Sequence, residues 1–407
     1  MIRRLRVSKG HGRLVRSPVR SNRKSVIDRK ETLKTPKSIA TQGGANKVHQ
    51  ACSIGLIIRQ KEPKVLETPV DRVERFLTPT ELFYVRSHSP APKLELASYR
   101  LQIDGAVRKP FSLTYQELRE IPAETCIAIL ECAGNSRVFL VPQVQGAQWE
   151  LGAVGNAEWT GVPLCVLLER AGLEEDACEI VLEGPDRGVR KEGAAPPGPV
   201  SYARSLPRAK ALQREVLIAY QMNGHELTQD HGYPVRAIVP GHYAMASVKW
   251  LTRIYAARAP FQGYWQTSDY GYWDYVDGQP VRRPLGEMKL KSEVFRPTAY
   301  ETVAPNQAYT VFGAAWAGET EVTEVSVSTD GGQTWVQAEL VDPVHRYAWR
   351  RWKFDWVTPK KPGQYTLMSR AKDANGNVQP DKHDENYATY VIDHVLPIEV
   401  TVGDPWS

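Results

Sequence analysis

The chain has 407 residues, of which 42% are hydrophobic and 24% charged, with 11 Trp and 18 Tyr. This length is too great for one ordinary hydrophobic core, and the composition excludes a disordered chain, so we predict a globular protein of two domains. The formal net charge of +6 owes much to the first 36 residues, where Asp28 and Glu31 are the only acids. No basic stripe interleaved with aromatic residues follows, and we therefore predict no nucleic-acid binding.

The five cysteines form no CxxC pair, which argues against a disulfide scaffold or a zinc ribbon and favours a reducing compartment. No run approaches the roughly 18 to 20 apolar residues that span a bilayer, and the N-terminus lacks the apolar segment of a secretory signal. We therefore predict a cytoplasmic protein without membrane contact. A mitochondrial location stays open, because the Arg- and Ser-rich, acid-poor leader has the composition of a transit peptide.

The first segment of the chain comprises residues 1–54, whose low hydrophobicity predicts a disordered basic leader. From residue 55 to 284, short apolar or alternating runs such as 125–130 and 235–239 predict strands bounded by Gly, Pro and Asn. The clearest helix is predicted at 163–171, where three leucines share one face and a glycine follows as a stop signal. This mixture predicts an α+β domain rather than a regular βαβ repeat.

An aromatic and proline-containing connector around 264–284 separates this domain from a region of strands and turns. The clearest of these strands are predicted at 309–316, 322–328, 347–356 and 364–371. About seven such strands in roughly 110 residues predict an immunoglobulin-like sandwich, here without cysteines to bridge its sheets. The second domain is therefore predicted at 285–400.

Cys132 is the first candidate for chemistry. It follows an apolar strand and precedes Ala-Gly-Asn, a small-residue turn that leaves room beside the sulfur. Arg137 follows five residues later, and a nearby cation favours the thiolate, which acts as a nucleophile or a soft metal ligand. The residues alone leave a packed free thiol, a hydrolase nucleophile and a metal ligand open. For a hydrolase, the candidate bases are His88, His225, His231 and His242.

Five segments follow one another in the first domain: 83–88 (FYVRSH), 131–137 (ECAGNSR), 219–224 (AYQMNG), 230–236 (DHGYPVR) and 247–251 (SVKWL). In this order they resemble the signature of the sulfite oxidase family of molybdopterin enzymes. Two later segments, 330–335 and 375–380, are similar to the dimerisation domain of that family. The resemblance implies an α+β molybdopterin-binding (sulfite-oxidase-like) domain at 55–284, an all-β immunoglobulin-like sandwich dimerisation domain at 285–400, and a homodimer.

The same resemblance implies Mo-molybdopterin as the cofactor, with Cys132 as the one protein ligand of the metal. It also implies which residues hold the pterin and its phosphate, a group that suits cations and backbone N–H donors. The residues on matching positions are Tyr84, Val85, Arg86, His88, Cys132, Asp186, Arg204, Lys210, Ser247, Val248 and Lys249.

The implied substrate is sulfite or another small oxyanion. Guanidinium donors in a desolvated pocket suit a compact dianion, and the family's catalytic positions are occupied here by Arg86, Arg137 and Tyr220. From the second domain, either Arg346 or Arg350 is a candidate to reach the same site.

We therefore predict an enzyme that oxidises sulfite to sulfate at a Cys-ligated molybdenum centre. The chain has no haem-binding HPGG or CxxCH motif and nothing that resembles a flavin domain, so the electrons should pass to an external acceptor, a cytochrome or oxygen. Two alternatives stay open. A reductase of nitrate or a sulfoxide on the same scaffold would need an electron source, and a non-catalytic immunoglobulin-like binding protein would leave the Cys132 segment without a purpose.

Overall fold

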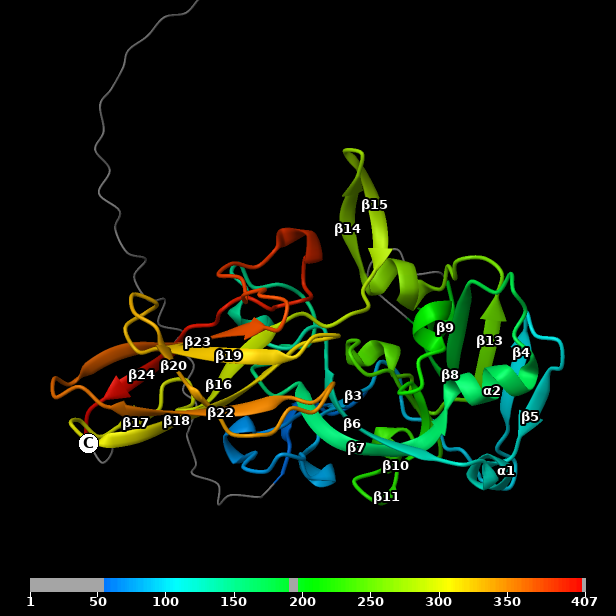
Figure 1. The fold of residues 1–407 in the computed structure, drawn as a ribbon, viewed down its shortest axis with the longest axis horizontal. Helices are drawn as coiled ribbons and strands as arrows, with labels where there is room; N and C mark the ends of the chain where they lie inside the picture. Colours follow the sequence, from blue (N-terminus) through cyan, green and yellow to red (C-terminus); the bar gives the residue numbers. More distant parts are fainter. Residues whose placement is uncertain (1–54, 190–196, 405–407) are drawn as a thin grey trace, which may run out of the picture. The chain divides into compact units, whose positions relative to one another are not determined.

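The computed structural model describes residues 55–189 and 197–404, and the predicted leader lies outside these ranges. Figure 1 shows sheets with a few short helices in the first part of the chain and a sandwich of strands in the last part. The predicted order, an α+β domain followed by an all-β sandwich, is confirmed.

Three sheets precede residue 264 in the described part of the chain. The first is antiparallel and contains β1 (Ile57–Gln60), β2 (Val65–Glu67) and β3 (Val85–Arg86). The second has the order β11-β10-β7-β6, with β12 also paired to β10; it comprises β6 (Glu124–Glu131), β7 (Val154–Pro163), β10 (Leu217–Met222), β11 (His225–Glu226) and β12 (Arg236–Ile238). The third has the order β5-β4-β13-β8-β9 and comprises β4 (Leu101–Gly105), β5 (Phe111–Leu113), β8 (Glu179–Val189), β9 (Pro199–Pro207) and β13 (Arg253–Ala257).

The helices in this part are short: α1 (Tyr115–Glu120), α2 (Leu164–Ala171) and α3 (Arg208–Ala211). Helix α2 is the one predicted at 163–171, and its three leucines are fully buried. It ends at Gly172, which takes the left-handed φ of +68° and donates its N–H to the Glu169 carbonyl at 2.9 Å. Single turns of 3-10 helix are η1 (Val70–Arg72), η2 (Thr80–Leu82), η3 (Arg137–Phe139), η4 (Gln229–His231), η5 (Ala244–Ala246) and η7 (Glu385–Tyr387). None of the helices described could cross a membrane, given their length and hydropathy.

The connector at 264–284 has more regular structure than its sequence predicts. It begins with a π-helix, η6 (Trp265–Asp269), and continues as an antiparallel hairpin of β14 (Gly271–Val276) and β15 (Gln279–Pro284). Asp277 and Gly278 both have positive φ, as a two-residue hairpin turn requires. Figure 1 shows the hairpin extending as a two-stranded arm.

The sandwich consists of two sheets. One has the order β16-β18-β22-β21 and comprises β16 (Lys291–Arg296), β18 (Ala308–Trp316), β21 (Glu339–Leu340) and β22 (Arg350–Val357). The other has the order β17-β24-β23-β19-β20 and comprises β17 (Thr302–Val303), β19 (Val322–Ser328), β20 (Val336–Gln337), β23 (Gly363–Asp373) and β24 (Ile398–Val402). The strand predicted at 347–356 starts only at Arg350, because Tyr347 has a φ of +68°, which a strand does not accommodate.

The apolar core of the first part continues into the sandwich. One cluster of buried side chains contains Ile129 and Val154 together with Phe295, Trp316 and Trp349. The predicted boundary near residue 285 falls between the end of β15 and the start of β16 and stays a prediction. The shared cluster means that the two parts are packed together rather than joined only by a linker.

Candidate active site

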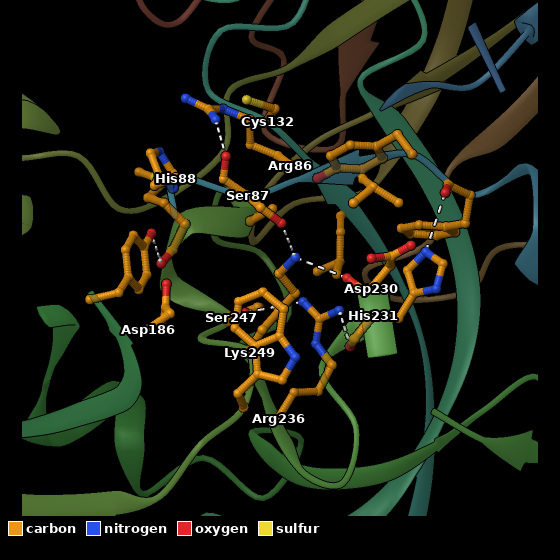
Figure 2. Close-up of a pocket in the computed structure, with 18 of the residues that line it drawn as sticks. Arg86, Ser87, His88, Cys132, Asp186, Asp230, His231, Arg236, Ser247 and Lys249 are labelled. Carbon is orange, nitrogen blue, oxygen red and sulfur yellow. Dashed lines mark hydrogen bonds between the residues drawn. The ribbon is translucent and has the colours of Figure 1, made fainter. Parts of the chain in front are cut away.

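A pocket with about 690 Å³ of empty space, part of it open to solvent, lies beside Cys132. Its lining includes most of the residues predicted from the sequence, namely Tyr84, Val85, Arg86, His88, Cys132, Asp186, Ser247 and Lys249. These residues come from separate segments of the chain, and Figure 2 shows how their side chains converge.

Cys132 lies directly after β6, at the start of a tight turn. Its N–H donates to the Ala153 carbonyl at 2.9 Å, and its own carbonyl accepts from the Asn135 N–H at 2.8 Å. A Cβ at Gly134 would lie 2.1 Å from a guanidinium nitrogen of Arg137, so a larger residue there would have to displace this guanidinium. Figure 2 shows Cys132 and Arg86 near the same end of the pocket, and both residues belong to its lining.

Two cations, the partly buried Lys249 and the buried Arg236, lie away from that end (Figure 2). The Lys249 ammonium donates to the Ser87 hydroxyl at 3.1 Å and to the Asp230 carbonyl at 2.9 Å. Arg236 donates to the carbonyls of His231 at 2.9 Å and Ser247 at 3.1 Å. Within residues 55–189 and 197–404, neither cation has a salt bridge to a carboxylate.

Burial lowers the pKa of Lys249 to about 7, with Arg236 adding to the effect, and burial lowers the pKa of Arg236 to about 10. Both shifts have the same cause, because removing a cation from water disfavours its charged form. An anionic group on a ligand would provide the missing counter-charge, so this end of the pocket suits a phosphate.

A third side of the pocket combines an acceptor with aromatic rings. The Oδ1 atom of Asp186 is buried and has no hydrogen-bond partner among the described residues. Burial raises the pKa of this carboxyl to about 6, although the nearby Lys249 opposes the shift. His88 lies against Trp265, with ring centroids 4.5 Å apart, and its Nε2 is 2.6 Å from the Tyr270 hydroxyl. A flat heterocycle with N–H donors fits such a wall.

The lining also contains polar residues that the sequence did not assign to the cofactor or substrate: Ser87, Tyr202, Asp230, Arg236, Tyr270 and His231, which was a candidate base for a hydrolase only. The residues in segment 230–236 could have been assigned from the sequence, because this segment is one of the five that carry the family resemblance. His231 is fixed by the Thr228 hydroxyl at 2.7 Å and the Phe83 carbonyl at 3.2 Å, and burial lowers its pKa to about 4. Tyr270 lies in the connector at 264–284, outside those five segments, so the resemblance did not point to it.

Five predicted site residues lie outside the lining: Arg137, Arg204, Lys210, Tyr220 and Val248. Val248 is buried, and its carbonyl accepts from the Ala237 N–H. Arg204 donates to the carbonyls of Trp265 and Leu285, the latter at 2.6 Å. Val248 and Arg204 therefore contribute to the packing around the pocket and do not line it.

Lys210 and Tyr220 point elsewhere. The Lys210 ammonium is 2.5 Å from a carboxylate oxygen of Glu319, a residue of the sandwich region. Tyr220 is the extra residue of a bulge, where the pairing of β10 with β7 shifts between Ala219 and Gln221. Its ring packs 6.4 Å from that of Tyr115, centroid to centroid.

Arg137 is buried and is not part of the pocket lining. It donates to the carbonyls of Thr389 at 3.0 Å and Ala147 at 2.8 Å, and its guanidinium carbon is 5.2 Å from the centre of the Tyr390 ring. The sandwich candidates lie apart from the lining: Arg346 pairs with glutamates, and Arg350 donates to backbone carbonyls.

Two family models match this chain. The oxidoreductase molybdopterin binding domain matches residues 88–265, and the Mo-co oxidoreductase dimerisation domain matches residues 282–394. Sulfite oxidase from Gallus gallus is 38% identical over 345 residues, which cover 80% of this chain and 73% of that protein. The chain belongs to the sulfite oxidase family of molybdopterin-dependent oxidoreductases.

Other members of the family agree with this placement. Mitochondrial sulfite oxidase from Rattus norvegicus is 35% identical over 345 residues, and the chain spans 61% of its length. The crystal structure of the sulfane dehydrogenase SoxCD from Paracoccus pantotrophus superposes with a TM-score of 0.74 at 28% identity, covering 90% of this chain and 96% of that chain. The predicted molybdopterin cofactor and oxidoreductase class are confirmed, and the second family model supports the predicted homodimer.

Proposed function

We propose that this molybdenum oxidoreductase oxidises sulfite to sulfate, that Cys132 is the protein ligand of the metal, and that the electrons pass to an external acceptor. In the reaction, sulfite and water give sulfate, two protons and two electrons. The observation that carries the proposal is that Cys132 and Arg86 both line one pocket, near the same end, and that this pocket also contains Lys249 and Arg236, two cations without a carboxylate partner among the described residues. The names of the chicken and rat relatives support sulfite as the substrate.

The residues present fit the cofactor at three places. The Cys132 thiolate is a soft ligand suited to molybdenum. Lys249 and Arg236 offer buried positive charge to the phosphate. The unpartnered Oδ1 of Asp186 offers an acceptor to an N–H of the pterin. When bound, the cofactor supplies oxygen-atom transfer and accepts the two electrons.

The chain's own groups then bind and orient the substrate. Arg86, half-buried and near the same end of the pocket as Cys132, offsets the charge of sulfite and of the sulfate that forms. We propose Tyr270 for the hydrogen-bonding role predicted for Tyr220, because Tyr270 lines the pocket and its hydroxyl is 2.6 Å from His88 Nε2. Arg137, whose guanidinium donates to two carbonyls, adds positive charge from the same turn as Cys132.

A comparison of wild type with Cys132→Ser tests the proposal. Both proteins are made in a host that supplies the cofactor, and molybdenum content is measured together with sulfite-dependent reduction of ferricyanide. The wild type should bind molybdenum and oxidise sulfite, and the variant should lose at least about 100-fold in rate, the upper end of what outer-shell changes at metal sites cost. Cys178→Ser is the matched control, because that cysteine is exposed and lies outside the pocket.

The same protein preparation distinguishes the alternatives. Activity with nitrate and reduced viologen, but none with sulfite, would contradict the proposal and favour a reductase. A wild-type protein without molybdenum would favour a binding protein. The acceptor is identified by following cytochrome reduction and hydrogen peroxide formation in parallel during sulfite oxidation.

A further inference from the structure

The residues from Glu131 to Arg137, named here the cysteine turn, are held by side chains of the sandwich. The Lys291 ammonium, on β16, is 3.1 Å from Glu131 Oε1 and donates to the Ser136 hydroxyl at 2.9 Å. Both charged residues are almost fully buried. The turn that carries the thiol is therefore tied to a strand of the other part of the molecule.

Glu293, two residues further along β16, completes the cluster. Its Oε1 accepts from the Ser136 hydroxyl at 2.6 Å and from the Asn135 amide at 3.1 Å, and it lies 2.8 Å from the Lys291 ammonium. From β18, Trp316 donates its indole N–H to Glu131 Oε2 at 2.9 Å. These partners offset part of the desolvation cost of the buried charges, so the cluster favours one arrangement of its members.

These contacts reach Cys132 through one further residue. The side-chain oxygen of Asn135 accepts from the Ala153 N–H at 2.9 Å, and the Ala153 carbonyl accepts from the Cys132 N–H at 2.9 Å. Ser136 has the unusual φ of +69°, and its hydroxyl is held between Lys291 and Glu293. Along this route, Glu293 is three hydrogen bonds away from the backbone of the cysteine.

The sandwich region also holds the turn through its last segment. The Val391 N–H donates to the Ala133 carbonyl at 2.7 Å, next to the cysteine. The Thr389 carbonyl accepts from Arg137 at 3.0 Å. Ala133 and Arg137 of the cysteine turn are therefore also in contact with residues that follow β15.

We propose that Lys291 and Glu293 are positioning residues for the Cys132 sulfur, so that the sandwich domain, besides its part in dimerisation, sets the place of the metal-binding thiolate. The role of the sulfur in this statement rests on the proposed function, whereas the positioning itself does not. The two are therefore tested by separate measurements.

The first measurement uses cofactor-free protein and needs no molybdenum. The rate at which iodoacetamide alkylates Cys132 is followed by peptide mass spectrometry, with the exposed Cys178 as internal reference. In Glu293→Ala this rate should rise roughly tenfold, because local opening of the turn becomes easier. Glu293→Gln keeps the accepting oxygen, and its rate should stay within about twofold of wild type.

Glu319→Ala is the matched control. Glu319 lies in the sandwich region and bonds to Lys210 at 2.5 Å and to the Tyr347 hydroxyl at 2.9 Å, but it is not among the partners of the cysteine turn. The rate of Cys132 alkylation in Glu319→Ala should equal that of wild type. An equal rise in both alanine variants, or no rise in Glu293→Ala, would overturn the proposal by showing only general loosening or no coupling.

If Glu293→Ala does not fold, Ser136→Gly replaces it. Glycine suits the φ of +69° and removes the hydroxyl between Lys291 and Glu293 without removing a charge. The alkylation rate should rise in the same direction. An unchanged rate in this variant would count equally against the proposal.

The second measurement uses the loaded enzyme. Glu293→Ala should shift the electron paramagnetic resonance spectrum of the half-reduced metal and lower kcat with little change in KM, and Glu293→Gln should restore both. A faster thiol reaction in the cofactor-free variant, together with an unshifted spectrum, would leave the positioning intact and contradict ligation by Cys132. The two failures are thus distinguishable.

Discussion

Cations are buried in two regions of this molecule, and their partners differ. In the pocket, Lys249 and Arg236 donate to carbonyls and a hydroxyl. At the contact with the sandwich, Lys291 lies within salt-bridge distance of both Glu131 and Glu293. The cations of the pocket therefore lack a carboxylate partner, whereas the cation at the contact with the sandwich has two.

This difference shows in the proton affinities. Burial raises the pKa of Glu293 to about 7, whereas the two carboxylates outweigh burial and raise the pKa of Lys291 above its ordinary value. In the pocket, burial instead lowers the pKa of Lys249 to about 7. A cation that lacks a carboxylate is poised for a ligand, and a cation between carboxylates serves assembly.

The largest effect is expected at the contact. Lys291→Met leaves Glu131 and Glu293 buried without their cation, so cofactor-free protein should lose about 3–5 kcal/mol of unfolding free energy. Urea denaturation at neutral pH measures this. Lys353→Met is the control, because Lys353 is 44% exposed and pairs with Glu339 on the surface, where such pairs contribute at most about 1 kcal/mol. Equal losses in both variants would refute the assembly role of Lys291.

A smaller, pH-dependent effect is expected in the pocket. The pKa of Lys249 is about 7 in the folded protein against an ordinary value of 10.5, so between these values the unfolded chain holds a proton that the folded chain has lost. Stability should therefore rise with pH across this window, and this rise should be absent in Lys249→Met. The slope of unfolding free energy against pH, compared between the two proteins, measures it.

Anion binding should change in the opposite direction. Sulfate stays a dianion throughout, so its affinity for the cofactor-free pocket should fall by about tenfold from pH 6 to pH 8.5 as Lys249 loses its charge. Calorimetric titration of wild type and Lys249→Met would show this difference. An affinity that is independent of pH in wild type would mean that Lys249 does not meet the anion.

Much of the fold followed from local sequence patterns. The strand predicted at 125–130 lies within β6, and helix α2 ends at the glycine that its sequence offers as a stop. The residues that line the pocket beside Cys132 were found because segments 83–88 and 247–251 resemble those of a known family. Local sequence patterns were sufficient to predict these elements, and the family resemblance was sufficient to predict most of the pocket lining.

The remaining differences arise from contacts distant in sequence. Tyr220 was expected to face the substrate, but the bulge between Ala219 and Gln221 is a property of strand pairing that no local pattern predicts. Lys210 was assigned to the cofactor, yet its carboxylate partner Glu319 is 109 residues away. Lys210 and Lys249 were both assigned to the cofactor from the sequence, but Lys249 lines the pocket and Lys210 pairs with a residue of the sandwich region. Only their partners in the folded protein distinguish them.

The smallest effect is expected at Arg346, which was a sequence candidate for the site. Its side chain is 58% exposed and lies 3.2 Å from Glu215 and 3.6 Å from Glu319, so Arg346→Ala should cost at most about 1 kcal/mol of stability. Its KM for sulfite should stay within about twofold of wild type, because Arg346 is not part of the pocket lining. Steady-state kinetics checks this directly. A tenfold rise in KM would show that a cation paired with carboxylates also serves the substrate, and the partner of a cation would then no longer distinguish binding from assembly.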